Sequence, residues 1–299
     1  MSVRAESATT RLPVRADLAA VMAALTTVCL WGSAFVGIRT AGAALSPGAL
    51  ALGRLIVSTA VLSVVAFVRR ESLPARRDLV AIAAYGVLWL GVYSVSLNAA
   101  ERRVDAGTAA MLINIGPILI VILAGLFLAE GFPRWLFAGC AVAFMGCVLI
   151  GIASSGSGSR GGLGIVLLIV AAVAYASAVV IQKPVLARVS PFRVVWLGCA
   201  VATLVCLPFA PALVGELGQA SATAVGWTIY LGLAPTALGF ATWAYALRHM
   251  NAGRLASLAY LIPLVAILLG WLVLGETPPW LAAVGGALCV AGVALARRR

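Results

Sequence analysis

The stretch that decides the fold is residues 102–149, RRVDAGTAAMLINIGPILIVILAGLFLAEGFPRWLFAGCAVAFMGCVL. Its pattern recurs at residues 248–295, RHMNAGRLASLAYLIPLVAILLGWLVLGETPPWLAAVGGALCVAGVAL. Residues that recur unchanged after a shift of 146 include Arg102, Ala106, Gly107, Pro117, Glu130, Pro133, Gly139, Ala141 and Gly146. At a shift of 144, Trp31 also meets Tyr175 and Arg39 meets Lys183. The chain is therefore a duplicated unit.

Each copy repeats a helix defect as well as a sequence. Both copies hold two apolar runs, and the first run has a proline at its centre and a glutamate at its end. In a membrane, interrupted helices at matching positions of two repeats indicate a transport site.

The composition predicts an integral membrane protein. Hydrophobic residues make up 63% of the 299 residues and charged residues 10%, which excludes an ordinary water-soluble domain. The net charge of +12 would suggest nucleic acid in a soluble chain, but these arginines lie between apolar runs, where they set orientation. We therefore expect a lipid bilayer and no nucleic acid as partner. The six cysteines have no C-x-x-C spacing, so neither disulfides nor a metal site is indicated.

Ten apolar runs are long enough to cross about 30 Å of hydrocarbon. They cover residues 18–38, 48–68, 79–100, 107–128, 135–153, 162–182, 192–213, 223–246, 252–274 and 280–296. The predicted fold is all-α, with two five-helix repeats at 18–153 and 162–296, a linker at 154–161, and tails at 1–17 and 297–299. Because each repeat has an odd number of spans, the two repeats should be inverted relative to each other.

Positive charges predict the orientation. If the amino end lies inside, the inner segments hold 16 arginines and lysines and the outer loops hold 4. Both termini should then be cytoplasmic, in a multi-pass protein of the cell membrane.

Pro117 and Pro263 are predicted to break the fourth and ninth spans about ten residues in, near the midplane. Each proline frees a carbonyl four residues earlier, at Ile113 and Ala259. A freed carbonyl should face protein or a wet cavity between the repeats, and we favour the cavity. The alternative is a packing kink healed by neighbouring helices.

Aromatic and polar side chains near these breaks are candidates for the lining of a substrate cavity. In the third span, Tyr85, Trp89 and Tyr93 share one helical face, and the matching face of the eighth span is small and includes Thr242. Such a pocket suits a ligand with an apolar or flat part. Further candidates at matched or midspan positions are Trp31, Tyr175, Asn114 and Tyr260. An aromatic stripe can equally serve packing or lipid contact.

Few charged residues are candidates for gating or coupling. Arg54 lies inside the second span, where it could anchor a substrate or gate the site, although a structural role is favoured. All nine acids lie in tails or at span ends, so no midspan acid is available for proton exchange. Glu130 and Glu276 form the symmetric acidic pair. They could couple transport, or each could cap the following helix.

These residues resemble the drug/metabolite transporter superfamily, specifically its EamA-type members. The motifs are Leu30-Trp31-Gly32-Ser33, Arg54, Ala106-Gly107 with Ala252-Gly253, and the midspan prolines followed by Glu130 and Gly275-Glu276. The resemblance covers about residues 18–296, and Ala129-Glu130 departs from the usual Gly-Glu. It implies a ten-helix basket around a central cavity that opens alternately to either side, with spans five and ten peripheral. It also implies export of amino acids or related metabolites.

The predicted function is secondary transport, with export of amino acids or similar small metabolites as the favoured hypothesis. Efflux of cationic or hydrophobic drugs is the alternative, although it usually calls for a midspan acid. A non-transport membrane protein is the third possibility. An enzyme is not expected, because the single histidine, His249, has no evident catalytic partner. No catalytic residue, metal or cofactor is predicted. The chain could be a monomer or a homodimer, since glycines in spans five and ten permit close packing within or between chains.

Overall fold

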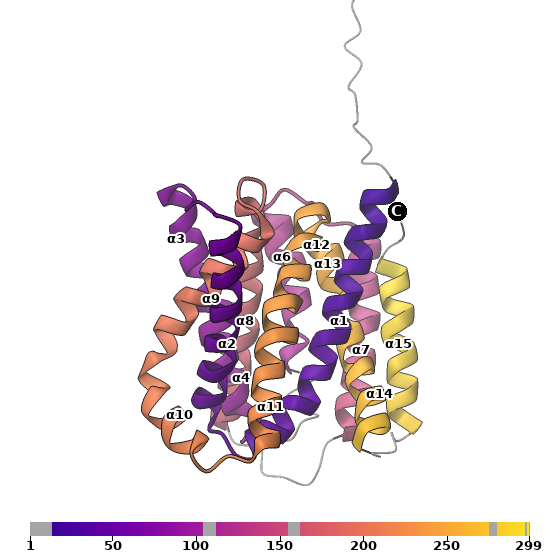
Figure 1. Ribbon diagram of the computed structural model, residues 1–299. Helices are drawn as coiled ribbons and strands as arrows, with labels where there is room; N and C mark the ends of the chain where they lie inside the picture. The colour runs from indigo at the N-terminus through magenta and orange to yellow at the C-terminus, as the bar shows by residue number, and fades with distance from the viewer. Residues whose placement is uncertain (1–13, 104–111, 155–161, 275–279, 297, 299) are drawn as a thin grey trace, which may run out of the picture.

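The chain forms a bundle of helices, as the ribbon of the computed structural model shows (Figure 1). Residues 14–103, 112–154, 162–274, 280–296 and 298 are described, and all regular structure within these ranges is helical. The first repeat contains α1 (Val14–Gly42), α2 (Pro47–Val68), α3 (Arg76–Tyr85), η1 (Gly86–Tyr93), α4 (Ser94–Glu101), α6 (Gly116–Phe127) and α7 (Arg134–Ser154).

The second repeat follows the same order. It contains α8 (Gly162–Val185), α9 (Pro191–Cys206), η2 (Leu207–Phe209), α10 (Ala210–Leu217), α11 (Ala222–Leu231), η3 (Gly232–Leu238), α12 (Gly239–His249), α13 (Ala252–Leu258), η4 (Ala259–Leu261), α14 (Ile262–Leu274) and α15 (Trp280–Ala296).

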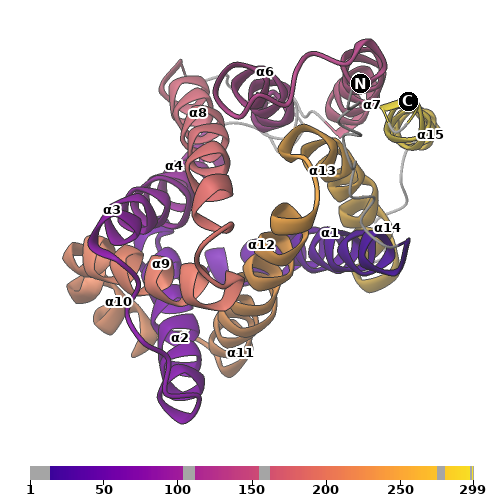
Figure 2. The ribbon, with the colours of Figure 1, turned by 90° about the horizontal axis from the view of Figure 1, so that it is seen from above.

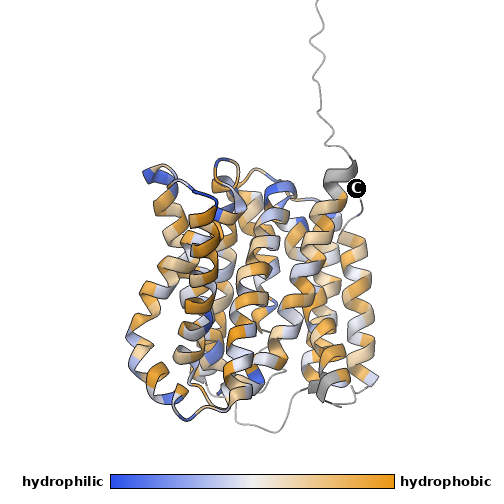
Figure 3. Cartoon of the chain, in the orientation of Figure 1, coloured by the Kyte–Doolittle hydropathy of each residue, from blue (hydrophilic) through white to orange (hydrophobic). Residues whose placement is uncertain are grey.

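The helices fall on the predicted spans. Eight stretches are long and apolar enough to cross a membrane, and Gly116–Phe127 and Trp280–Ala296 are shorter apolar helices. The first part of the predicted span 107–128 lies outside the described residues. Apolar residues dominate the length of the bundle and polar residues gather at its ends (Figure 3). The prediction of an all-helical, multi-pass membrane protein is confirmed.

Both proline-marked spans are broken where the sequence predicts. The helical turn at residues 112–113 gives way to a turn at 114–115, and α6 begins anew at Gly116. In the second repeat, the short 3₁₀ helix η4 separates α13 from α14 just before Pro263. Since proline has no N–H to donate, the regular hydrogen-bond ladder cannot continue through either position.

A second pair of helix irregularities was not predicted. η1 and η3 are π-helices, and their first residues, Gly86 and Gly232, are 146 positions apart, so the repeat includes this defect. The prediction of a regular α-helical face in the third span is therefore wrong over Gly86–Tyr93. Tyr85 and Trp89 of this face are buried, whereas Tyr93 is half-buried. π-helices are rare and frequently mark functional sites.

The repeats exchange helices to make two lobes. In lobe A, α1 packs against α11, η3, α12, α13 and α14 of the other repeat. In lobe B, α8 packs against α3, η1, α4 and α6. Seen along the bundle, α6, α8, α12 and α13 surround its centre (Figure 2). We call the end at which α1 and α3 begin and α12 ends the basic end; it is at the top of Figure 1.

Outside the two lobes, α7 and α15 make the most extensive helix–helix contact among the described residues. Glycines let the two backbones touch: a Cβ added at Gly146 would lie 2.5 Å from the carbonyl oxygen of Gly285. The small faces of the fifth and tenth predicted spans are thus used within one chain.

Candidate functional site

Five aromatic side chains meet where the lobes face each other. The central aromatic cluster consists of Trp31 (α1), Trp89 (η1), Tyr175 (α8), and Phe240 and Trp243 (α12). Ring centroids are 4.8 Å apart for Trp89 and Tyr175 and 5.1 Å apart for Trp31 and Trp243. All but the half-buried Trp31 are buried. The cluster therefore draws its rings from both lobes and both repeats.

The other predicted cavity residues gather around this cluster. Tyr85 contacts the Trp89 ring and Tyr93 contacts the Tyr175 ring, each with centroids 5.9 Å apart. Tyr260 lies close to Tyr175 from η4. Asn114 is buried at the break before α6, as is Pro117.

Thr242 lies differently. Its hydroxyl pairs with that of Thr27 at 2.8 Å and donates to the carbonyl oxygen of Gly239 at 3.0 Å. It thus joins α12 to α1. The small face predicted as a cavity wall in the eighth span instead receives Trp31, whose Nε1 lies 3.0 Å from a Cβ added at Gly239.

Six buried polar atoms around the cluster have no hydrogen-bond partner within the described residues. They are Tyr85 Oη, Tyr175 Oη, Tyr260 Oη, Trp243 Nε1, and Gln182 Oε1 and Nε2. An unpaired buried polar group costs about 1–3 kcal/mol of folding free energy, so natural proteins keep few of them. Concentrated at the junction of the lobes, these atoms could bind the polar groups of a ligand.

Three residues of this region, Phe240, Trp243 and Gln182, were not predicted. Phe240 and Trp243 lie three positions apart on α12, and an aromatic search of the eighth span could have found them. Gln182 is a buried amide among the apolar residues of α8. The sequence could have indicated Gln182, because an amide is unusual within an apolar membrane span.

The π-helix η3 is fastened by side chains of α1 and α2. Trp31 Nε1 donates to the carbonyl oxygen of Pro235 at 3.1 Å, and Ser58 Oγ donates to that of Gly232 at 2.8 Å. Arg54 is buried, and its Nε donates to Thr236 Oγ1 at 3.1 Å. These donors serve carbonyls and a hydroxyl of the irregular turn.

Glu130 caps a helix of the other repeat. Its carboxylate accepts hydrogen bonds from Ala252 N at 2.7 Å and Gly253 N at 3.2 Å, at the start of α13, whose N-cap Asn251 makes no side-chain cap bond. The interpretation of Glu130 as a cap on its following helix, α7, is therefore corrected. Its counterpart Glu276 lies outside the described residues.

Lys183 of α8 binds the end of α12, directly before the helix that Glu130 caps. Its Nζ donates to the carbonyl oxygens of Leu247 and Met250 at the end of α12, and it lies close enough to Glu130 to interact electrostatically. Each charge matches the dipole of the helix end that it binds. We call this pair the Glu130–Lys183 clamp. It joins lobe B to lobe A at the basic end.

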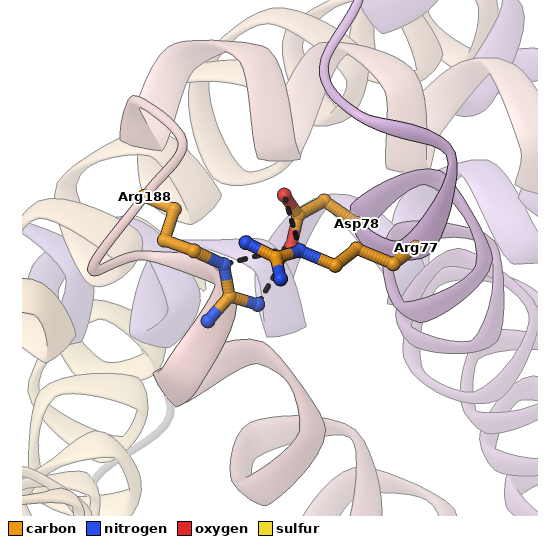
Figure 4. A network of polar contacts seen from close by, with 3 residues as sticks. All are labelled: Arg77, Asp78 and Arg188. Atoms are coloured by element: carbon orange, nitrogen blue, oxygen red, sulfur yellow. Dashed lines mark hydrogen bonds and ion pairs between the residues drawn. The ribbon is translucent and has the colours of Figure 1, made fainter.

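Ion pairs add to the contacts between repeats at the basic end. Asp78 at the start of α3 accepts hydrogen bonds from Arg188 Nε and Nη2 at 3.0 and 2.6 Å, with Arg77 beside it (Figure 4). Glu71 pairs with Arg193 of α9. The first pair joins α3 to the segment between α8 and α9, and the second joins the segment between α2 and α3 to α9.

A surface groove of about 470 Å³ lies elsewhere, between α1, α11 and α14. Its lining includes Ser33, Trp227 and Tyr230, and the Ser33 and Tyr230 hydroxyls pair at 2.6 Å. None of its lining residues belongs to the central aromatic cluster. In this conformation the rings of the central aromatic cluster other than Trp31 are buried, and the groove lies apart from them.

Sequence comparison identifies the family of this helical fold. The profile of the EamA-like transporter family matches residues 18–152 and matches again at residues 162–298. The chain belongs to the EamA-like transporter family. The resemblance inferred from the duplicated motifs is confirmed.

Relatives of this EamA-like protein span nearly its whole length. A "Probable terminal-alkyne amino-acid exporter" of Streptantibioticus cattleyicolor is 38% identical over 280 residues, which cover 94% of each chain. A "Probable amino-acid metabolite efflux pump" of Salmonella typhimurium is 26% identical, over 90% of this chain and 92% of the relative. A solved crystal structure superposes with a TM-score of 0.76 at 21% identity, over 93% of this chain and 96% of that chain, which shows a shared fold.

Family membership establishes the general class of this EamA-like protein. It is a multi-pass membrane protein of a transport family, and its relatives are named for transport rather than for catalysis. Within the part of the chain that the structure describes, no group of three or more His, Cys, Asp or Glu residues could hold a metal ion.

Proposed function

We propose that this protein exports amino acids or related small metabolites across the cell membrane by alternating access. The observation that carries the proposal is the central aromatic cluster, surrounded by buried polar atoms without regular hydrogen bonds at the junction of the two lobes. A site at the midplane between repeats is where transporters of inverted topology bind substrate.

The chemistry of the cluster favours a small molecule with both an apolar and a polar part. Indole and phenol rings offer flat apolar surface, and the tyrosine hydroxyls and the glutamine amide offer hydrogen bonds. All nine acids of the sequence lie in tails or at span ends, which disfavours a lipophilic cation. The two relatives named as a "Probable terminal-alkyne amino-acid exporter" and a "Probable amino-acid metabolite efflux pump" add support from comparison.

The proposed orientation of the protein in the membrane follows from the distribution of its positive charges. The basic end should face the cytoplasm, because cytoplasmic loops carry the excess of arginine and lysine. Both termini would then be cytoplasmic. The Glu130–Lys183 clamp would hold the lobes together on the cytoplasmic side in the conformation described here.

Flux measurements on purified protein test the proposal. Proteoliposomes loaded with a panel of labelled amino acids should release at least one of them faster than protein-free liposomes do. Trp89→Ala protein, reconstituted to the same density, supplies the matched control. If no amino acid in a broad panel moves while a cationic dye does, drug efflux replaces amino acid export.

A further inference from the structure

Tyr85 and Gln182 form a buried polar pair between α3 and α8. Tyr85 is fully buried and Gln182 is 1% exposed, and they are close neighbours. Among the described residues, neither the tyrosine hydroxyl nor either polar atom of the amide has a hydrogen-bond partner of regular geometry, although the hydroxyl and the amide are close enough to interact with each other. Gly198 of α9 fixes the position of the tyrosine, because an added Cβ there would lie 2.5 Å from Tyr85 Cε1.

The fold does not require polar residues at these positions. In the other copy, Leu231 corresponds to Tyr85 at the shift of 146, and Ile38 corresponds to Gln182 at the shift of 144. Leu231 and Ile38 pack in one apolar cluster. Apolar residues can therefore fill this position of the repeat, whereas the Tyr85–Gln182 copy keeps buried polar atoms that lack regular hydrogen bonds, at a cost in folding free energy.

The pair adjoins the central aromatic cluster on the side toward the basic end. The rings of Tyr85 and Trp89 meet edge to face at 5.9 Å. On the other side, Cys199 of α9 is an electrostatic neighbour of both Tyr85 and Arg54, the buried arginine of α2. A ligand that spans the pair and the cluster would thus have apolar rings at one end, and neutral hydrogen-bonding groups with a cation beyond them at the other.

We propose that Tyr85 and Gln182 bind the α-carboxylate and α-ammonium groups of a zwitterionic amino acid, whose apolar side chain packs in the central aromatic cluster. The amide has both chemistries that a zwitterion needs: Nε2 donates to the carboxylate and Oε1 accepts from the ammonium. The tyrosine hydroxyl donates to the carboxylate. This inference rests on the proposed function, and it narrows the substrate to amino acids with neutral apolar side chains.

Substrate analogues and matched variants test the site. The assay compares two compounds. One is an apolar amino acid chosen because the wild-type protein exports it, and the other is the corresponding amine, which lacks the carboxylate. Wild-type protein should prefer the amino acid by at least tenfold in rate. Tyr85→Leu and Gln182→Ile, which copy the other repeat, should each lower amino acid flux at least tenfold. Tyr85→Leu should change amine flux less than twofold, because the tyrosine hydroxyl is assigned to the carboxylate that the amine lacks.

Controls separate binding from folding. Gln219→Ile, which removes an exposed amide, should leave the preference unchanged. Tyr85→Phe removes a single oxygen and should reduce the preference even if a larger change impairs folding. In detergent, the amino acid should raise the melting temperature of wild-type protein but not of Gln182→Ile protein.

The possible failures are distinct. If wild-type protein exports amino acids and the folded variants keep the full preference over the amine, the site assigned to Tyr85 and Gln182 is wrong and the proposed function stands. If wild-type protein moves no amino acid, the proposed function fails and this site fails with it.

Discussion

The two π-helices occupy matching places in the repeats, yet they are held differently. Side chains from α1 and α2 donate hydrogen bonds to carbonyls of η3, from Trp31 to Pro235 and from Ser58 to Gly232. Among the described residues, no side chain donates to a carbonyl of residues 86–92 in η1. η1 instead packs against α8 and α9, near the unpaired hydroxyls of Tyr85 and Tyr175.

We propose that this difference separates a structural part of the protein from a part that binds substrate. At η3, side chains of α1 and α2 bind two carbonyl oxygens of the π turn. Beside η1, the hydroxyls of Tyr85 and Tyr175 remain as candidates to bind a ligand. The same irregular turn would then serve a different purpose in each repeat.

The largest expected effect comes from Trp89 in η1. Its ring contacts those of Trp31, Tyr85, Tyr175, Phe240 and Trp243. Trp89→Ala should cost about 3–5 kcal/mol of stability and bring flux to background, because the centre of the cluster is lost. Thermal unfolding and flux measure both effects. Trp227→Ala in the outer groove should spare flux, and a Trp89→Ala protein that transports normally would refute a role for the cluster.

The next effect concerns the fastening of η3. Ser58→Ala removes a donor to the carbonyl oxygens of Gly232 and Arg54, so the protein should lose about 1–3 kcal/mol of stability. Denaturation in mixed micelles measures this loss. An unchanged midpoint would show that the hydrogen bonds to η3 carry little energy.

The converse change should give η1 a similar fastening. Ala202 of α9 corresponds to Ser58 at the shift of 144 and is buried beside η1. Ala202→Ser would place a hydroxyl beside η1 at the position that corresponds to Ser58 beside η3. Turnover should therefore fall several-fold, while the melting temperature stays equal or rises. Faster turnover would contradict the assignment of η1 to the part that binds substrate.

A smaller effect is expected at the Glu130–Lys183 clamp. Glu130→Ala removes the acceptors for Ala252 N and Gly253 N, and loss of such a cap costs about 1 kcal/mol. Hydrogen exchange at these two amides should accelerate about fivefold. Glu216→Ala, which removes a cap from Ser46 N at the opposite end, is the matched control and should not change their exchange.

The smallest effect is expected at the Asp78–Arg188 ion pair. Arg188 is 44% exposed, and Asp78 in the first turn of α3 retains both the helix dipole and Arg77. Arg188→Met should therefore cost at most about 1 kcal/mol. Added salt should shrink the difference in melting temperature from wild type. A loss of several kcal/mol would make this pair a principal lock between the repeats.

The sequence predicted the fold because its determinants are local and repeated. Apolar runs between arginines mark spans, and Pro117 and Pro263 must each interrupt a helical ladder whatever surrounds them. The π turns escaped prediction because GVLWLGVY at Gly86–Tyr93 has the composition of any apolar helix. Proline inside η3 is a local signal, but its counterpart in η1 is Trp89.

The site was predicted only in part, because much of it depends on contacts between lobes. Trp31, Trp89 and Tyr175 were predicted from matched positions and helical spacing, and the structure brings them together. The cap that Glu130 places on α13 joins residues 122 positions apart, which no local pattern encodes. Gln182 gave only a weak signal, since a single amide in an apolar run becomes distinctive once its neighbours are known.

The helix pairs α7–α15 and α2–α9 lie at opposite corners of the molecule, and the line between them divides lobe A from lobe B (Figure 2). If each lobe tilts as a rigid body, that line is the natural pivot, and at its α7–α15 end glycines bring the two helix backbones into direct contact. The motion would resemble a seesaw: separation at the basic end brings the far ends together. Displacement would then be smallest along the pivot and greatest at the lobe tips most distant from it.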